Sequence, residues 1–192
     1  MNTRTTNERI ALGALTAILV LGGCRKDEGS TDQPPVVNEE EVITTVRLHM
    51  ENATQHVHLE WTDLDGDGGA APVITADTLS VDSVYEVEVE LLNESVSPAV
   101  DVSAEVADEG VDHQFFFQVS GTGTTFAYAD ADANGNPIGL AAVCTAGPSG
   151  TGTLTLTLRH QPDKYATGVS DGDITNAGGE TDVEVTFPLV VD

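Results

Sequence analysis

The strongest constraint on the fold is an alternation of apolar and polar side chains with a period of two. It begins at Val42 and recurs to the end of the chain. Residues 153–158 alternate threonine with leucine, and residues 85–91 alternate apolar side chains with glutamate. Successive side chains of a strand point to opposite faces, so each such segment predicts a strand with one apolar face. Similar segments are residues 42–50, 57–61, 115–119, 126–128 and 182–191, and residues 140–144 form a short apolar run.

Amphipathic strands of this kind form sheets that bury their apolar faces against each other. About eight strands within roughly 150 residues fit one domain. The sequence therefore predicts an all-β fold, a single antiparallel β-sandwich with Ig-like architecture over residues 42–192. One short helix is expected within residues 103–112, where Gly110 weakens it.

Charge limits the classes of partner. The 192 residues include 32 Asp and Glu but only 7 Lys and Arg, which gives a formal net charge of −25. A nucleic-acid partner is excluded, because a polyanion requires a basic surface. The sequence also lacks the motifs G-x-S-x-G, H-E-x-x-H and the phosphate loop. These observations predict a protein that is not an enzyme, with a protein or small-ligand partner that the sequence does not identify.

The first residues have the features of a bacterial lipoprotein signal. Arg4 and Arg9 precede an apolar stretch from Ile10 to Leu21, and Leu21-Gly22-Gly23-Cys24 follows. The apolar stretch is too short for an ordinary spanning helix. The pattern predicts a signal peptide over residues 1–23 and lipidation of Cys24, which would anchor the protein to a membrane. A plain secretory signal with an incidental cysteine is the alternative.

The polar residues 24–41 predict a flexible tether between the lipid and the domain. Arg25 stands where an aspartate usually retains lipoproteins in the inner membrane of enteric bacteria, so the outer membrane is the expected location. Lys26-Asp27-Glu28 resembles a surface-export signal of lipoproteins in one large Gram-negative group and predicts display on the cell surface. If these residues are only a charged tether, the protein stays on the periplasmic face. With Cys24 lipidated, Cys144 cannot form an intramolecular disulfide, and its apolar surroundings predict a buried, inert thiol.

Two loops match the first half of a calcium-binding loop, in which alternate oxygens converge on one ion before a glycine. One contains Asp63, Asp65 and Asp67, and the other contains Asp130, Asp132 and Asn134. Both lack the acidic residue at the twelfth loop position, so distant residues would have to complete the coordination. The pattern predicts calcium as a cofactor, and the alternative is plain turns, because Asp, Asn and Gly also favour turns.

Three histidines suggest a second kind of metal site. If residues 52–55 form a four-residue hairpin loop, the flanking strands place three pairs opposite each other: Glu51 and His56, His49 and His58, Arg47 and Glu60. His49, His56, His58 and Glu51 then lie on one polar face and could bind Zn²⁺ or Cu²⁺. A shift of one residue in the register would separate them, and a solvated strand face is the alternative.

Several stretches carry a resemblance to a known group of proteins. They include DGDGGAAP at residues 65–72 and GDITNAGGETD at residues 172–182, with shorter ones at residues 75–79, 90–94, 112–116, 136–140 and 158–162. In these stretches the chain resembles a group of small, uncharacterised lipoproteins of Gram-negative bacteria. Some members are labelled as containing a type 1 periplasmic-binding domain, which implies an α/β fold, whereas the alternation here predicts strands. The resemblance implies a lipid-anchored protein and brings no catalytic or binding residues.

Together these features predict an outer-membrane lipoprotein that presents an acidic β-sandwich as a binding or interaction module ordered by calcium. The alternative is a protein that captures a small ligand or a transition metal for a transporter. Calcium-dependent stability would favour the first function. A deep apolar pocket or a converged set of histidines would favour the second.

Overall fold

The computed structural model describes residues 41–66 and 68–192. The predicted signal peptide, Cys24 and nearly all of the predicted tether lie outside the described residues, as does Asp67. All described residues belong to one compact unit. Within them, ten strands, one α-helix and two short 3-10 helices are assigned.

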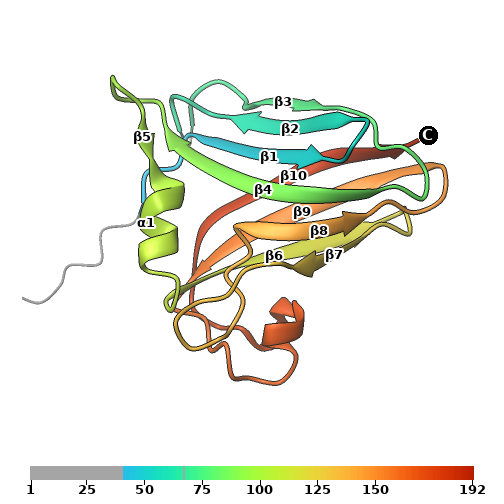
Figure 1. Cartoon of the computed structure of the whole chain (residues 1–192). Helices are drawn as coiled ribbons and strands as arrows, with labels where there is room; N and C mark the ends of the chain where they lie inside the picture. Colours follow the sequence, from blue (N-terminus) through green and yellow to red (C-terminus); the bar gives the residue numbers. More distant parts are fainter. Residues whose placement is uncertain (1–40, 67) are drawn as a thin grey trace, which may run out of the picture. The chain divides into compact units, whose positions relative to one another are not determined.

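Seven strands form the larger sheet, which continues from one edge to the other in the order β3-β2-β1-β4-β8-β7, with β5 paired to β4 (Figure 1). All of these pairs are antiparallel. The strands are β1 (Thr45–Glu51), β2 (His56–Thr62), β3 (Val73–Ala76), β4 (Val84–Asn93), β5 (Val100–Asp101), β7 (Thr125–Tyr128) and β8 (Ala141–Thr145).

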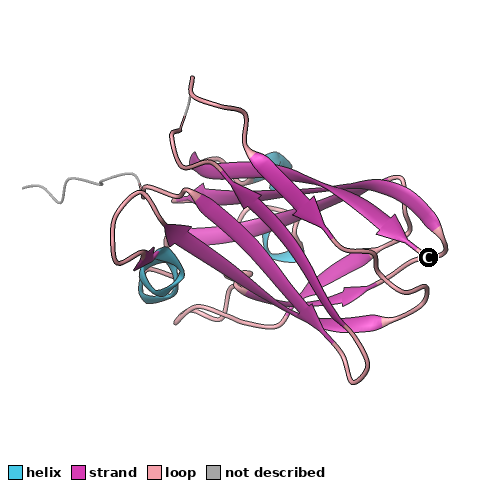
Figure 2. Cartoon of the chain, turned by 90° about the horizontal axis from the view of Figure 1, so that it is seen from above, coloured by secondary structure: helices cyan, strands magenta, loops and turns pink. Residues whose placement is uncertain are grey.

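The smaller sheet has three antiparallel strands in the order β10-β9-β6. They are β6 (His113–Ser120), β9 (Gly150–His160) and β10 (Glu180–Val191). The helix α1 (Val102–Asp108) lies at one end of the strands, as the view from above shows (Figure 2). The short helices η1 (Val169–Asp171) and η2 (Ile174–Asn176) lie in the connection between β9 and β10.

The predicted all-β sandwich is confirmed, and so is a short helix near residue 103. The structure has ten strands where the alternation predicted about eight. The additional strands are β3 and β5, which are four and two residues long and have only exposed residues. Neither has a buried face, and both are too short to show an alternation, so the periodicity of the sequence does not reveal them. No helix within the described residues has the length and apolar character needed to cross a bilayer.

The core lies between the inner faces of the two sheets. The row Leu154, Leu156 and Leu158 of β9 is completely buried, and apolar rows of β1, β2, β4 and β10 complete the core. Burying one such side chain contributes about 1.5–3 kcal/mol. On β9 this inner row continues from Leu158 to His160, and on β6 it continues from Phe115 back to His113. The apolar interior therefore ends in two histidines at one end of the sandwich.

Candidate functional site

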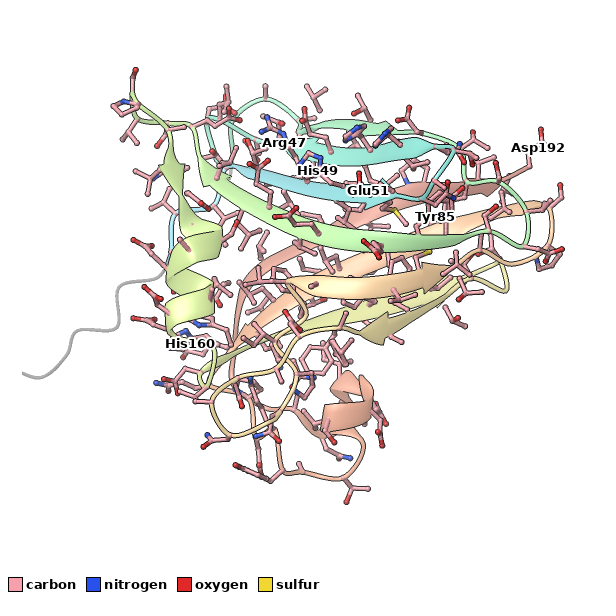
Figure 3. The ribbon with its side chains drawn as sticks, in the orientation of Figure 1. Arg47, His49, Glu51, Tyr85, His160 and Asp192 are labelled. Atoms are coloured by element: carbon pink, nitrogen blue, oxygen red, sulfur yellow. The ribbon has the colours of Figure 1, made fainter. Side chains whose placement is uncertain are left out.

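The two histidines at the end of the core face each other directly. His113 is the first residue of β6 and His160 is the last residue of β9, and the register of these strands pairs them. Nε2 of His113 lies 2.9 Å from Nδ1 of His160, and the rings meet edge-on with their centroids 4.6 Å apart. His113 is fully buried and His160 is 4% exposed. Figure 3 shows His160 at the end of the sandwich where α1 lies.

Two carboxylates complete this cluster. Oε1 of Glu41 lies 3.2 Å from Nε2 of His113, and Oδ2 of Asp182 lies 3.7 Å from the same nitrogen. The two side chains are only 9% and 4% exposed. The register of β10 shifts between Thr181 and Val183, so Asp182 is the extra residue of a bulge. Bulges re-aim a side chain, and this one brings a carboxylate into the interior.

One ligand atom from each of these four residues lies within 4.8 Å of the other three. We call Glu41, His113, His160 and Asp182 the His–carboxylate cluster. Nδ1 of His113 is 3.2 Å from the carbonyl oxygen of Glu109, which identifies Nδ1 as the protonated nitrogen. When the ring is neutral, Nε2 directs its lone pair into the cluster. Metal-bound histidines are oriented by the same kind of hydrogen bond to a backbone carbonyl.

The charge of the cluster favours a bound cation. Removing a carboxylate from water costs several kcal/mol unless an opposite charge or hydrogen bonds compensate it. Oε2 of Glu41 is buried, yet it accepts no hydrogen bond from any described residue. A divalent cation between the four ligand atoms would compensate both carboxylates.

The donor set fits a transition metal of the zinc type. Zn²⁺ binds imidazole nitrogen and carboxylate oxygen at about 2.0–2.2 Å, which places tetrahedral ligands about 3.3 Å apart. The distances of 2.9, 3.2 and 3.7 Å around Nε2 of His113 bracket that separation. Four protein ligands in a buried site are typical of a structural zinc ion, because catalytic zinc keeps a position open for water or substrate.

The predicted register of the histidine-bearing hairpin is confirmed. Across β1 and β2, Glu51 lies opposite His56, His49 opposite His58, and Arg47 opposite Glu60. The asparagine of the loop caps it, because Oδ1 of Asn52 accepts hydrogen bonds from the backbone of Thr54 and Gln55.

The side chains of this hairpin form two separate pairs. Nδ1 of His49 lies 3.0 Å from Nδ1 of His58, and its Nε2 lies 3.3 Å from Glu90 of the neighbouring β4. His56 instead pairs with Glu51 at 3.3 Å. Figure 3 shows His49 and Glu51 on β1, on the side of the molecule away from His160. Within the described part of the chain, three or more potential metal ligands converge only in the His–carboxylate cluster. Metal binding by His49, His56, His58 and Glu51 stays a prediction.

The first predicted calcium loop is exposed. Oδ1 of Asp63 accepts a hydrogen bond from the amide of Gly66, and Oδ2 of Asp65 accepts one from the amide of Ala70. Asp67, the third predicted ligand, lies outside the described residues. The other oxygen of each of these two carboxylates has no hydrogen bond from a described residue, so calcium binding at this loop stays a prediction.

In the second predicted calcium loop the carboxylates already have partners. Asp130 accepts hydrogen bonds from the backbone amides of Gly139 and Ala141. Oδ1 of Asp132 accepts hydrogen bonds from the amides of Asn134 and Asn136. These bonds fold the loop back on itself. A calcium ion would have to compete with them.

The other oxygen of Asp132 faces an ammonium group. Nζ of Lys164 lies 3.0 Å from Oδ2 of Asp132, and it also donates to the carbonyl oxygens of Pro137 at 2.9 Å and Gly110 at 2.5 Å. Both side chains are almost completely buried. Burial alone would raise the pKa of Asp132, but the hydrogen bonds from Lys164 and from the two amides outweigh it, so the pKa lies below 3.8. The lysine therefore provides a positive charge where an ion was predicted.

Two further features bear on ligands and reactivity. Cys144 is free and fully buried, as predicted, and burial raises its pKa to about 12, which makes the thiol inert. On the outer face of the larger sheet, a groove of about 970 Å³ is lined by α1, β4 and β8. Glu86, Glu88 and Asp130 contribute carboxylates to it, and His49 of β1 also lines it.

The sequence contained a signal for the His–carboxylate cluster that its interpretation missed. In both β6 and β9, an inner apolar row ends in a histidine at the next core-facing position.

No protein-family model matches this chain, and neither the curated proteins nor the solved structures include a significant match. The chemistry of the site therefore has to be inferred from its geometry.

Proposed function

We propose that this protein is an outer-membrane lipoprotein whose acidic β-sandwich is a non-enzymatic binding module that holds a divalent transition-metal ion. The observation that carries the proposal is the convergence of Glu41, His113, His160 and Asp182 within 4.8 Å in a buried position. Zn²⁺ is the favoured ion, because two imidazoles and two carboxylates are among its preferred ligands.

Thermal unfolding tests the metal proposal directly. We expect Zn²⁺ to raise the melting temperature of the full lipoprotein in detergent, and a chelator to reverse the effect. Mg²⁺ at equal ionic strength controls for screening of the negative charge. Asp182→Asn should remove the zinc effect, whereas Glu180→Gln, an exposed change on the same strand, should retain it. Equal shifts with Zn²⁺ and Mg²⁺, or an undiminished zinc shift in Asp182→Asn, would refute the metal site.

The membrane part of the proposal is supported by the sequence Leu21-Gly22-Gly23-Cys24 after an apolar stretch. Cys24→Ser should release a folded domain from the membrane fraction, because the tether separates the lipid from the sandwich. A variant that remains with membranes after a carbonate wash would show that the lipid is not the anchor.

Display on the cell surface is supported by Lys26-Asp27-Glu28. Protease added to intact cells should release the domain by cleavage within residues 25–41. Protection in intact cells, followed by cleavage after rupture of the outer membrane, would place the protein on the periplasmic face instead.

A second candidate function is capture of a small ligand or metal for a transporter. The groove of about 970 Å³ favours it, because ligand sites have volumes of about 300–1,000 Å³. The carboxylates that line the groove would select a cationic ligand. Rapid exchange of bound zinc with a competing chelator would favour capture, whereas exchange over hours would favour a structural ion.

A further inference from the structure

We infer that a metal ion in the His–carboxylate cluster fastens the segment through which the chain enters the sandwich, so that metal occupancy controls how often this segment detaches from the smaller sheet. This inference rests on the proposed function, because it requires an ion at the same four residues. It concerns residues 41–44, which we call the entry segment.

The four ligands come unequally from the two sheets. His113, His160 and Asp182 lie on β6, β9 and β10, which are the three strands of the smaller sheet. Glu41 instead precedes β1, a central strand of the larger sheet. An ion bound to all four residues would therefore connect the smaller sheet to the chain that leads into the larger one.

The far end of the entry segment is firmly attached to the larger sheet. The amide of Thr44 donates to the carbonyl oxygen of Leu92 at 2.9 Å, and Oγ1 of Thr44 accepts a hydrogen bond from the amide of Glu94 at 2.7 Å. The carbonyl oxygen of Thr44 accepts from the amide of Asp63 at 2.8 Å. The segment thus runs from the smaller sheet at Glu41 to the larger sheet at Thr44.

Between these two ends the entry segment has few attachments. It contains no helix or strand, and within the described residues its first backbone hydrogen bonds are those of Thr44. Ile43 packs partly against the core, whereas Val42 is 58% exposed. The Glu41 carboxylate is therefore the attachment nearest the predicted tether, and its partner in the described structure is His113.

Coordination would strengthen this attachment. A ligand that binds better when the entry segment is ordered shifts the population toward the ordered state by its difference in affinity. Without the ion, Glu41 keeps its contact with His113, but one carboxylate oxygen stays buried without a hydrogen bond from any described residue. We therefore expect the entry segment to open readily in the metal-free protein and rarely in the zinc-bound protein.

Hydrogen exchange tests the inference on the full lipoprotein in detergent. Zinc should slow exchange of the amides of residues 42–46 about tenfold or more relative to chelator-treated protein, because these amides exchange by local opening. Exchange in β7, which contributes no ligand, should not change. Glu41→Gln removes one of the four proposed ligands, so it should weaken zinc binding by at least the 10- to 100-fold that is typical of losing a supporting partner of a metal ligand, and it should abolish the protection. Glu180→Gln is the matched control.

The outcomes separate the inference from the proposed function. If calorimetry detects no zinc binding, the proposed function fails and the inference fails with it. If zinc binds through His113 and His160 but exchange of residues 42–46 is unchanged, the fastening role is wrong and the metal site stands. Zinc binding of undiminished affinity in Glu41→Gln would also overturn the fastening role. If Glu41→Gln does not fold, the inference is decided by whether zinc slows exchange of residues 42–46 in the wild-type protein.

Discussion

Two places in this sandwich hold carboxylates away from water, and they compensate the negative charge differently. Asp132 lies in a loop at the surface of the sandwich, where the ammonium group of Lys164 contacts it at 3.0 Å. In the His–carboxylate cluster, Glu41 and Asp182 contact the imidazole of His113 instead. A lysine carries its positive charge permanently near neutral pH, whereas an imidazole can be neutral and can then act as a metal ligand.

The comparison indicates which of the two sites depends on an external ion. Lys164 also donates to two backbone carbonyl oxygens, so the Asp132 site is complete within the chain. The His–carboxylate cluster leaves one oxygen of Glu41 without a hydrogen bond from any described residue. The second loop that resembles a calcium site thus already has a cation beside it, the ammonium group of Lys164 from the connection between β9 and β10. The His–carboxylate cluster, which matches no sequence motif, is the site that offers four ligand atoms.

Removal of the Lys164 ammonium group should have the largest effect on the free energy of unfolding. Lys164→Met leaves the Asp132 carboxylate buried without its ion-pair partner, which typically costs about 3–5 kcal/mol of unfolding free energy. Urea unfolding measures the loss. Adding Asp132→Asn should recover part of it, because the uncompensated charge is then removed. Arg159→Met, which removes a cation at a more exposed position, should cost only about 1 kcal/mol or less. A Lys164→Met variant as stable as wild type would show that the lysine does not compensate Asp132.

Zinc should distinguish the two histidine pairs of the molecule. At a hundredfold excess over its dissociation constant, an ion that binds only the folded state stabilises it by about 2.7 kcal/mol, which raises the melting temperature by several degrees. His160→Gln should remove this stabilisation, and His58→Gln should not, because His58 belongs to the exposed pair with His49. Loss of the zinc effect in His58→Gln alone would transfer the metal site to the hairpin.

Calcium should have a smaller effect than zinc, since in one of the two predicted loops Lys164 already neutralises an aspartate. At a tenfold excess over its dissociation constant, calcium would contribute about 1.4 kcal/mol through the first loop. Thermal melts in millimolar CaCl₂ and in MgCl₂ at matched ionic strength provide the measurement. Asp65→Asn combined with Asp67→Asn should abolish the part that is specific to calcium. Equal shifts with both ions would mean that calcium only neutralises charge.

Acid should remove the contribution of the Asp132–Lys164 pair gradually. The pKa of Asp132 is lower in the folded protein than its ordinary value of 3.8, so the unfolded chain takes up the proton first as the pH falls. The stability from Asp132 is therefore fully present above the unfolded pKa of about 3.9 and is lost as the pH falls through the folded pKa. The difference in stability between wild type and Asp132→Asn should be constant near neutral pH and shrink below about pH 4. A difference that widens on acidification would contradict the sign of this shift.

The two histidine pairs also show what the sequence could predict. The pairing of His49 with His58 follows from a four-residue loop, because a short loop fixes the register of both strands. The pairing of His113 with His160 joins residues 47 positions apart, and no local turn determines it. Only the assembled smaller sheet brings these two strands together.

Glu41 and Asp182 were equally inaccessible to sequence reasoning. Asp182 alternates with Val183 and Val185, so the period of two assigns it to the solvent face, and only the bulge brings it inside. Glu41 ends a run of three glutamates that resembles a charged tether. The alternation itself was sufficient to predict the sandwich. Burial of the apolar faces determines that the two sheets pack together, independently of the local structure at the ends of the strands.

The bulged last strand has a consequence for how the protein is made. The ligands of the His–carboxylate cluster extend from residue 41 to residue 182, so nearly the whole domain must be synthesised before the fourth ligand exists. Folds dominated by such distant pairings form slowly, in milliseconds to seconds. A chain shortened before β10 would offer three ligands at most. Tight metal binding would therefore mark finished molecules, and a metal-sensitive probe could follow the maturation of this protein without a label on the chain.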